Sequence, residues 1–307
     1  MVKKIVDRIE WTADGLERSR QYILLSYPEY KDTLARALRL RDGLRVVDVG
    51  CGTGAYSRLL AEGIKPKGKI VGVDLNRSLL KTAKKQAVLV GSGALMEFKK
   101  GDAYDLPLPD NSADLSFCHT VLWILGEPLK ALREMTRVVR SSGMVAASEP
   151  DSGLFTYYNP TDERYMKLAW RDHEARMNGL KKLYGYDFCI GRKIPYLFKQ
   201  TGLVDIRVYG RFFADLTSDL RQKTLEQELD FYKWQLKFMT SNNAKSSNRR
   251  RQQVKVRLAG GMTKREIEEY QRKTIDWLRT VLHDPSKLKD DFSFTTWGGL
   301  IVTGRKP

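Results

Sequence analysis

The most constraining feature of this sequence is a regular alternation of two kinds of segment between residues 44 and 150. Short apolar runs rich in Val and Ile predict strands, and the stretches between them carry apolar residues at helical spacing. Such alternation is typical of βαβ units, in which helices cover both faces of a parallel sheet. The predicted strands span 45–50, 69–74, 94–102, 114–122 and 143–150, and the predicted helices span 55–63, 76–90 and 128–140.

Outside this region helical patterns predominate. A further helix and strand at 194–210 and a closing strand at 291–307 bring the predicted sheet to seven strands. We therefore predict an α/β fold with a Rossmann-like, doubly wound, mostly parallel seven-stranded sheet and helical cap insertions. The predicted parts are an N-terminal helical cap at 1–40 with a break near Pro28, the core at 41–150, a helical cap insertion at 151–190, the core continued at 191–214, a helical, basic insertion at 215–290 and the closing strand at 291–307.

A glycine-rich turn follows the first predicted strand, in the sequence VVDVGCGTG. Glycines at such a turn let the backbone approach a ligand closely, and the next helix begins with free N–H groups. The spacing is GxGxG, whereas a dinucleotide fingerprint reads GxGxxG. Asp48, inside the strand, would repel a pyrophosphate but suits the ammonium group of an amino-acid moiety. Asp48 could also cap the loop N–H groups.

Two more acids end the second and third predicted strands. Asp74 can accept hydrogen bonds from both hydroxyls of a ribose. Asp102 can accept one from the exocyclic amine of adenine, and the apolar Leu75 and Ala103 can flank the ring. The three strand ends therefore predict sites for an amino acid, a ribose and an adenine, in that order.

With these residues in place, the sequence resembles the class I methyltransferases that use S-adenosylmethionine. Asp48 through Gly54 match the first motif of that family, Asp74 its ribose acid, and Asp102 with Ala103 its adenine contact. The segment after Asp102 is similar to the ubiquinone/menaquinone-biosynthesis group of small-molecule methyltransferases. The residues that carry this second likeness are Pro107, Asp110, Ser112, Asp114, Glu134, Arg137, Val138 and Gly143.

The resemblance implies S-adenosylmethionine as methyl donor, S-adenosylhomocysteine as product, and direct in-line transfer to a small, apolar or aromatic acceptor. It covers residues 44–150 closely and 191–208 more loosely, and it leaves out 241–257. Aromatic residues in the predicted caps favour a ring-bearing acceptor, unless they form the core of the caps. The candidate donor-binding residues are Asp48, Gly50, Cys51, Gly52, Gly54, Asp74, Leu75, Asp102, Ala103, His119 and Tyr22.

Four residues are candidates for the catalytic base. His119, on the fourth predicted strand, contacts the donor or acceptor or is a hydrogen-bonded core histidine. Glu149 and Asp151 follow the fifth predicted strand, where they could take a proton or cap loops. His173, in the cap insertion, is a further candidate. Methyl transfer depends mainly on alignment of the reacting atoms, so a base is the least constrained feature.

The net charge of +17 invites anionic partners such as nucleic acid, a membrane surface or acidic small molecules. Residues 151–307 hold 30 of the 54 basic residues and 19 of the 37 acidic ones. The densest basic cluster lies at 241–257, in a Ser/Asn-rich stretch that predicts a mobile loop. The charge is therefore more a surface property than the basis of the chemistry. The oligomeric state cannot be read from the sequence.

Other functions stay open at this point. An RNA methyltransferase would use the basic second half of the chain to hold phosphates, although the sequence lacks an RNA-binding module and an NPPY-type tetrapeptide after the fourth strand. A non-catalytic S-adenosylmethionine-binding protein is a second alternative. Cys51, Cys118 and Cys189 are a poor set for arsenite methylation, and no spacing predicts a metal site. Without a signal peptide or a long apolar run, we expect a cytoplasmic protein.

Overall fold

The computed structural model describes residues 13, 16, 17, 28–219 and 224–307, which form two compact units. The first unit comprises residues 1–151, 189–211 and 299–307, and the second comprises 152–188 and 212–298. Tyr22 and most of the predicted N-terminal cap lie outside the described residues. No helix in the described part of the chain is long and apolar enough to cross a lipid bilayer.

The first unit is built on the parallel strands that the sequence predicts. The strands are β1 (Arg45–Val49), β2 (Lys69–Asp74), β3 (Met96–Lys100), β4 (Ala113–His119) and β5 (Val139–Pro150). Their order is β3-β2-β1-β4-β5, and every neighbouring pair among them is parallel. The order reverses between β1 and β4, which creates a crevice at their carboxyl ends where ligands bind in open α/β sheets.

The sheet continues with three more strands, β6 (Thr156–Tyr158), β7 (Val204–Leu216) and β8 (Phe294–Arg305). β8 pairs antiparallel with β5, β6 pairs with the beginning of β8, and β7 pairs with β8. The predicted α/β fold is confirmed, but the sheet has eight strands where we expected seven. The additional strand, β6, is only three residues long, which is too short to leave a periodic signal in the sequence.

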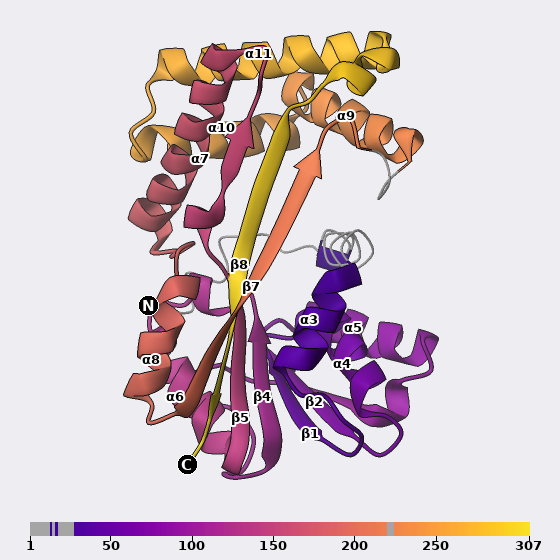
Figure 1. Cartoon of the computed structure of the whole chain (residues 1–307), viewed down its shortest axis with the longest axis vertical. Coiled ribbons are helices and arrows are strands. Elements are labelled where there is room, and N and C mark those ends of the chain that lie inside the picture. The colour runs from indigo at the N-terminus through magenta and orange to yellow at the C-terminus, as the bar shows by residue number, and fades with distance from the viewer. Residues whose placement is uncertain (1–12, 14–15, 18–27, 220–223) are drawn as a thin grey trace. The chain divides into compact units, whose positions relative to one another are not determined.

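Helices cover both faces of this sheet (Figure 1). On one side lie α3 (Pro28–Ala37), α4 (Ala55–Ile64) and α5 (Arg77–Leu89), and on the other α6 (Pro128–Val138) and α8 (Ile194–Gln200). Their beginnings follow local chemistry: Asn76 caps α5 by accepting the N–H groups of Ser78 and Leu79, and Pro128 occupies the first turn of α6. Short 3₁₀ helices are η1 (Gly93–Leu95), η2 (Leu122–Ile124) and η4 (Gly191–Lys193).

The second unit is mainly helical. Its helices are α7 (Glu163–Tyr184), α9 (Leu225–Thr240), α10 (Ala244–Ala259) and α11 (Lys264–His283), with the 3₁₀ helices η3 (Ser152–Leu154) and η5 (Pro285–Asp290). Thr224 and Thr263 form capping boxes at the starts of α9 and α11. Within the described residues, the core of this unit includes two small clusters: α7 packs against α11 around Leu168 and Ile267, and α9 packs against α11 around Tyr232 and Leu278.

The basic stretch at 241–257 is not a mobile loop, as we expected, but the helix α10. Asn243 caps it by accepting the N–H of Ser246 at 2.8 Å, so a Ser/Asn-rich start that looked like low complexity is a helix signal. α10 then crosses α7 so closely that a Cβ added to Gly179 would lie 1.9 Å from the Val256 carbonyl oxygen. This tight crossing supplies the tertiary contacts that fix the helix.

Candidate active site

The glycine loop at 50–54 connects β1 to α4 and forms the floor of the candidate site. Gly50, Gly52 and Gly54 all have left-handed backbone angles, with φ of 69°, 55° and 74°. A Cβ on Gly50 would lie 2.4 Å from Cγ2 of Val121, so this position has no room for a side chain. Among the described residues, a Cβ on Gly52 would meet only Leu16, at 4.0 Å. The loop therefore opens at Gly52, where a ligand can approach the backbone.

Protein oxygens already accept most of the N–H groups of this loop. Gly50 and Cys51 donate to the Val73 carbonyl at 2.7 and 3.1 Å, Gly52 to Asp74 at 2.9 Å, and Gly54 to Cys51 at 2.9 Å. A phosphate-binding loop instead directs its N–H groups at the ligand. The geometry thus agrees with the GxGxG spacing in disfavouring a pyrophosphate.

Asp48 lies under the loop and is 2% exposed. Its Oδ2 accepts a 2.5 Å hydrogen bond from the hydroxyl of Ser57, in the first turn of α4. The neighbouring thiol of Cys51 is also buried, and burial together with the charges of Asp48 and Asp74 raises its pKa well above the ordinary value. The raised pKa keeps Cys51 a neutral thiol, in agreement with a packing rather than a redox role.

Asp74 ends β2 with both carboxylate oxygens held by backbone groups. Oδ2 accepts from Gly52 N–H at 2.9 Å, and Oδ1 accepts from Asn76 N–H at 2.8 Å. Burial raises the pKa of Asp74, although both hydrogen bonds act in the opposite direction. Because each carboxylate oxygen can accept more than one hydrogen bond, Asp74 is fixed in place and still able to accept from a ligand.

Asp102 follows β3 and is fixed in the same way. Its Oδ1 accepts the N–H of Tyr104 at 2.9 Å, which closes a tight local turn. Leu75 and Ala103, the two predicted flanking residues, line the same cavity as Asp74 and Asp102. Leu75 is 39% exposed, which leaves an apolar surface available to a flat ring.

His119 ends β4 and is 5% exposed in the cavity wall. Its Nδ1 lies 3.2 Å from the hydroxyl of Tyr30, and its ring stacks on Tyr56 with a centroid distance of 3.7 Å. The Tyr30 hydroxyl also lies 3.1 Å from Oγ of Ser148, which in turn accepts a long 3.4 Å hydrogen bond from Arg211. These contacts from α3, α4 and β5 fix the orientation of the imidazole.

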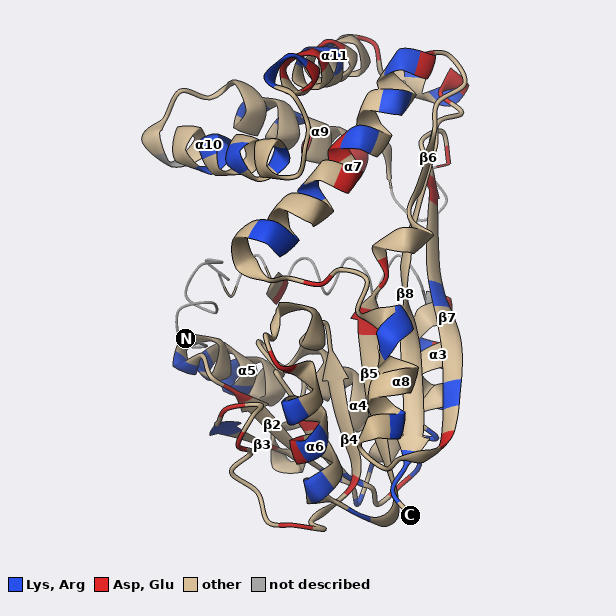
Figure 2. Cartoon of the chain, turned by 90° about the vertical axis from the view of Figure 1, so that its left-hand side faces the viewer, with Lys and Arg blue, Asp and Glu red and all other residues tan. Residues whose placement is uncertain are grey.

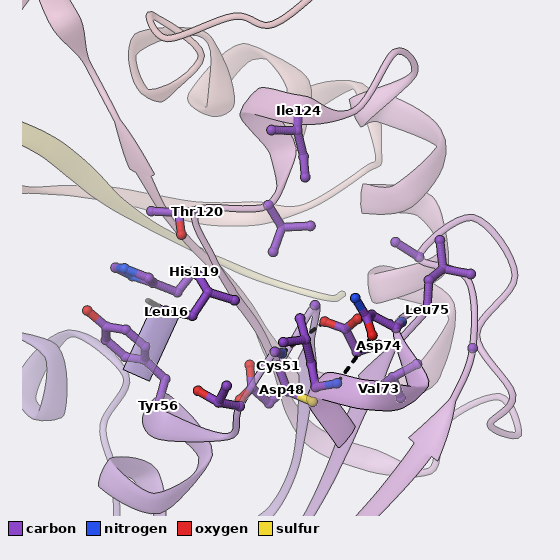
Figure 3. Close-up of a pocket in the computed structure, with 18 of the residues that line it drawn as sticks. Leu16, Asp48, Cys51, Tyr56, Val73, Asp74, Leu75, His119, Thr120 and Ile124 are labelled. Atoms are coloured by element: carbon purple, nitrogen blue, oxygen red, sulfur yellow. Dashed lines mark hydrogen bonds between the residues drawn. The ribbon is translucent and has the colours of Figure 1, made fainter. Parts of the chain in front are cut away.

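These residues line one cavity of about 1070 Å³, counting its open mouth. In Figure 3, His119 and Tyr56 lie at one end, Asp48 and Cys51 in the middle, and Asp74 and Leu75 at the other end. Of the predicted donor-binding residues, Gly54 does not line the cavity, because its φ of 74° instead serves the turn into α4.

The other three predicted bases lie elsewhere. Glu149 is fully buried, and its oxygens accept the N–H groups of Val121, Leu122 and Trp123 at 2.8, 2.9 and 3.4 Å. Burial raises the pKa of Glu149 to about 7, despite these hydrogen bonds. The geometry thus favours the loop-capping role that the sequence left open for Glu149.

Asp151 is 2% exposed and forms a two-pronged ion pair with Arg192, whose Nε donates to Oδ2 at 2.8 Å. His173 belongs to the second unit, where it stacks on Phe155 at a centroid distance of 3.8 Å and lies 3.3 Å from the Ser152 carbonyl. Burial lowers the pKa of His173. Neither residue lines the cavity of the first unit.

Sequence reasoning missed one wall of the cavity, which follows His119. Thr120 has a φ of 52°, a left-handed conformation that is rare for a β-branched residue. Its N–H donates to the Ser148 carbonyl at 2.9 Å, and the Trp123 indole donates to its carbonyl at 3.0 Å. The strained turn directs Val121, Ile124 and Leu125 into the cavity. Only the apolar run VLWIL hints at this wall in the sequence.

Comparison with known proteins agrees with this geometry. Residues 47–147 match the family model of the methyltransferase domain. Demethylmenaquinone methyltransferase of Staphylococcus aureus is 25% identical over 194 residues, which cover 60% of this chain and 79% of the relative. An uncharacterized 37.1 kDa transposon protein of Streptomyces fradiae is 33% identical over 131 residues, which cover 43% of this chain and only 37% of the relative.

Two solved structures show the same fold. A protein from Bacillus halodurans aligns with a TM-score of 0.50 and 15% identity, over 90% of this chain and 98% of that one. Phosphoethanolamine N-methyltransferase 2 of Haemonchus contortus, solved with S-adenosylhomocysteine, aligns with a TM-score of 0.51 and 15% identity, over 100% of this chain and 61% of that one.

Fold, cavity and comparisons together define a class I S-adenosylmethionine-dependent methyltransferase. Within that class, the similarity to demethylmenaquinone methyltransferase agrees with the likeness to the quinone-biosynthesis group that the sequence motifs predicted.

Proposed function

We propose that this enzyme methylates a small, apolar, ring-bearing acceptor that carries an acidic hydroxyl, and that His119 takes the proton of that hydroxyl. The observation that supports the proposal best is the placement of His119, Asp48, Asp74 and Asp102 along one cavity, in the order of the neighbouring strands β4, β1, β2 and β3 that carry or precede them. The order matches the parts of the donor, with its adenine far from His119 and its reactive end near it.

The cavity residues fit S-adenosylmethionine. Asp74 offers both carboxylate oxygens to the ribose hydroxyls, because Gly52 and Asn76 already hold it rigidly. Oδ2 of Asp102 is the acceptor that we assign to the adenine amine, with Leu75 against the ring. The buried charge of Asp48 suits the ammonium group, and the open side of Gly52 leaves room for the amino-acid chain.

When bound, S-adenosylmethionine supplies a methyl group on a positively charged sulfur, an activated leaving group. His119 then has two tasks: it accepts the acceptor's hydroxyl proton and keeps the resulting oxyanion beside a protonated ring. The Tyr30 hydroxyl, 3.2 Å from Nδ1, stabilises one orientation and one tautomer of the imidazole. The buried wall excludes water and lets alignment of the two substrates do most of the work.

Two observations support an apolar, ring-bearing acceptor. The wall after His119 presents the apolar side chains of Val121, Ile124 and Leu125 to the cavity. The relatives from Staphylococcus aureus are demethylmenaquinone methyltransferases, enzymes named for a ring-bearing acceptor. An acceptor of this kind becomes nucleophilic when a ring hydroxyl loses its proton, which is the step that a positioned histidine can assist.

The test combines binding and turnover. Calorimetry with S-adenosylmethionine should show one site, and labelled methyl groups should transfer to hydroxyl-bearing rings such as the reduced form of demethylmenaquinone. Analogues with the hydroxyl blocked should not react. Donor binding without transfer to any such ring, or equal transfer to blocked analogues, would contradict the proposed acceptor and the role of His119.

A further inference from the structure

Helix α10 carries an unbalanced positive charge. Its sequence holds six Lys and Arg residues and no Asp or Glu, whereas α11 holds five Lys and Arg and four Asp and Glu. Figure 2 shows the contrast, with blue alone along α10 and blue mixed with red along α11. The side chains of Arg249, Arg251 and Lys255 are exposed, and within the described residues none of the three has an ion-pair partner.

The positive surface extends onto α7. Gly179 is the position at which the backbone of α10 comes close to α7, and Arg176 and Lys182 lie three residues to either side of it. That spacing places both on the side of α7 next to α10. Both are exposed, and neither has an ion-pair partner in the part of the chain that the structure describes. We call Arg176, Lys182, Arg249, Arg251 and Lys255 the basic surface.

A row of aromatic rings lies on α9, the helix before α10, and its first two rings are exposed while the third is half-buried. Phe231 is 54% exposed and Trp234 57% exposed, and their rings are nearly parallel at 6.0 Å. Phe238 continues the row, with its ring 5.8 Å from that of Trp234 at an angle of 12°. We call these three residues the aromatic stripe. They follow the i, i+3, i+7 spacing of one helix face, opposite the face that packs on α11.

The stripe lies on α9 and most of the basic surface lies on α10, and these two helices of the second unit contact each other. Only three residues separate α9 from α10, and Arg250 of α10 donates a 2.6 Å hydrogen bond to the carbonyl of Phe238. Exposed rings beside unpaired cations are the features by which a helix lies at a membrane interface, with apolar groups inserted and cations near acidic headgroups.

We propose that the α9–α10 region of the second unit docks on an anionic lipid surface. The charge of the basic surface complements acidic headgroups, and the aromatic stripe supplies side chains that enter the interface. The stripe suits lipid better than RNA, because its rings stack on one another, whereas RNA binding needs open ring faces for the bases. Leu258 is 46% exposed and follows Arg251 by seven residues and Lys255 by three on the same face of α10, where it adds an aliphatic group that cannot stack on a base.

The test is binding of the full chain to phosphatidylcholine vesicles with and without phosphatidylglycerol. We expect binding to the anionic vesicles only, weakened by added salt. The triple variant R249Q/R251Q/K255Q should lose about 100-fold in affinity. Trp234→Ala should lose about ten-fold, and this loss should persist at high salt.

Matched controls separate these effects from general ones. K81Q/K84Q/K85Q removes three exposed cations from α5 in the first unit, and Tyr196→Ala removes an exposed ring from α8. Both should bind vesicles like the wild type. Calorimetry with S-adenosylmethionine in every variant keeps a failure of this proposal distinct from a failure of the proposed function.

Three results would overturn the proposal. Binding to neutral vesicles as tight as binding to anionic ones would show that the charge of the basic surface does not contribute. Binding to a single-stranded RNA but not to anionic vesicles would assign the surface to nucleic acid. An unchanged vesicle affinity of Trp234→Ala, with a raised KM for a water-soluble acceptor, would assign the stripe to the acceptor instead.

Discussion

The acids at two parts of the sheet edge, separated by β1 and β4, differ in what they contact. Asp74 and Asp102, at the ends of β2 and β3, each use backbone N–H groups for position and still line the cavity. Glu149 and Asp151, at the end of β5, are buried by the protein itself, one by three backbone N–H groups and the other by Arg192. All four stand at the carboxyl edge of the same sheet.

The difference shows what a strand-end acid does and does not predict. Position after a strand predicts that a carboxylate lies at the edge where ligands bind. Whether it meets a ligand depends on the groups that reach it first. At β5 those groups are the strained turn after His119 and an arginine 41 residues away, and both are products of the tertiary fold.

The largest expected effect is the loss of donor affinity when one of the cavity acids is removed. Asp74→Ala removes two charge-assisted hydrogen bonds to the ribose and should weaken S-adenosylmethionine binding about 1,000-fold in calorimetry. Glu97→Ala, which removes an exposed acid from β3, should bind the donor normally. If a folded Asp74→Ala variant bound S-adenosylmethionine with wild-type affinity, Asp74 would not be the ribose-binding residue.

His119 is the cavity residue whose loss should affect turnover more than binding. His119→Gln should lower kcat by about 10²–10³-fold, because a positioned base is lost, while the Kd of the donor changes only a few-fold. Tyr30→Phe should lower kcat less, since it keeps the imidazole and removes the 3.2 Å contact to its Nδ1 together with the 3.1 Å contact to Ser148. An unchanged kcat for the glutamine variant would leave His119 as a core residue.

Of the two buried acids, Glu149 should make the free energy of unfolding depend on pH. Its pKa of about 7 in the folded chain exceeds the ordinary 4.5, so between these values the folded state holds a proton that the unfolded state has lost. Stability from this group is therefore full below pH 4.5 and falls by about 3 kcal/mol as the pH rises to 7. In urea unfolding, the unfolding free energy of Glu149→Gln should not fall in this way. If the unfolding free energies of the variant and the wild type changed in parallel with pH, this role of Glu149 would be refuted.

The smallest effect should come from the Asp151 ion pair. Arg192→Gln leaves a buried carboxylate with weaker partners and should cost about 1–2 kcal/mol in unfolding free energy, a reduced value because Arg192 is half exposed. Lys199→Gln, an exposed cation nearby on α8, should cost nothing measurable. A large loss of donor affinity in Arg192→Gln would place this pair in the binding site after all.

The sequence predicts the regular parts of the fold well, because local patterns determine them. The run KIVGVD coincides with β2, and the helix expected at 194–202 is α8 (Ile194–Gln200). The sequence predicts α10 wrongly, since its Ser/Asn-rich start resembles a loop until Asn243 is seen to cap a helix. It cannot predict β6, which exists only because β8 offers a partner.

In the candidate site, too, the sequence predicts the features that local patterns determine and misses those that the tertiary fold determines. The three strand-end aspartates and the glycine loop are readable because they lie next to the strands that position them. The partners of His119 cannot be predicted from the sequence, because Tyr30 lies 89 residues away from it in the chain. The left-handed turn at Thr120 is equally invisible, because contacts with Ser148 and Trp123 impose it on a residue that disfavours it.

The most direct test of the central claim is a crystal structure with S-adenosylhomocysteine bound. The account predicts the ribose hydroxyls on Asp74, the adenine amine on Asp102, and the amino-acid end over Gly52 with the sulfur toward His119. A product bound in the reverse direction, or with its ribose away from Asp74, would contradict the account.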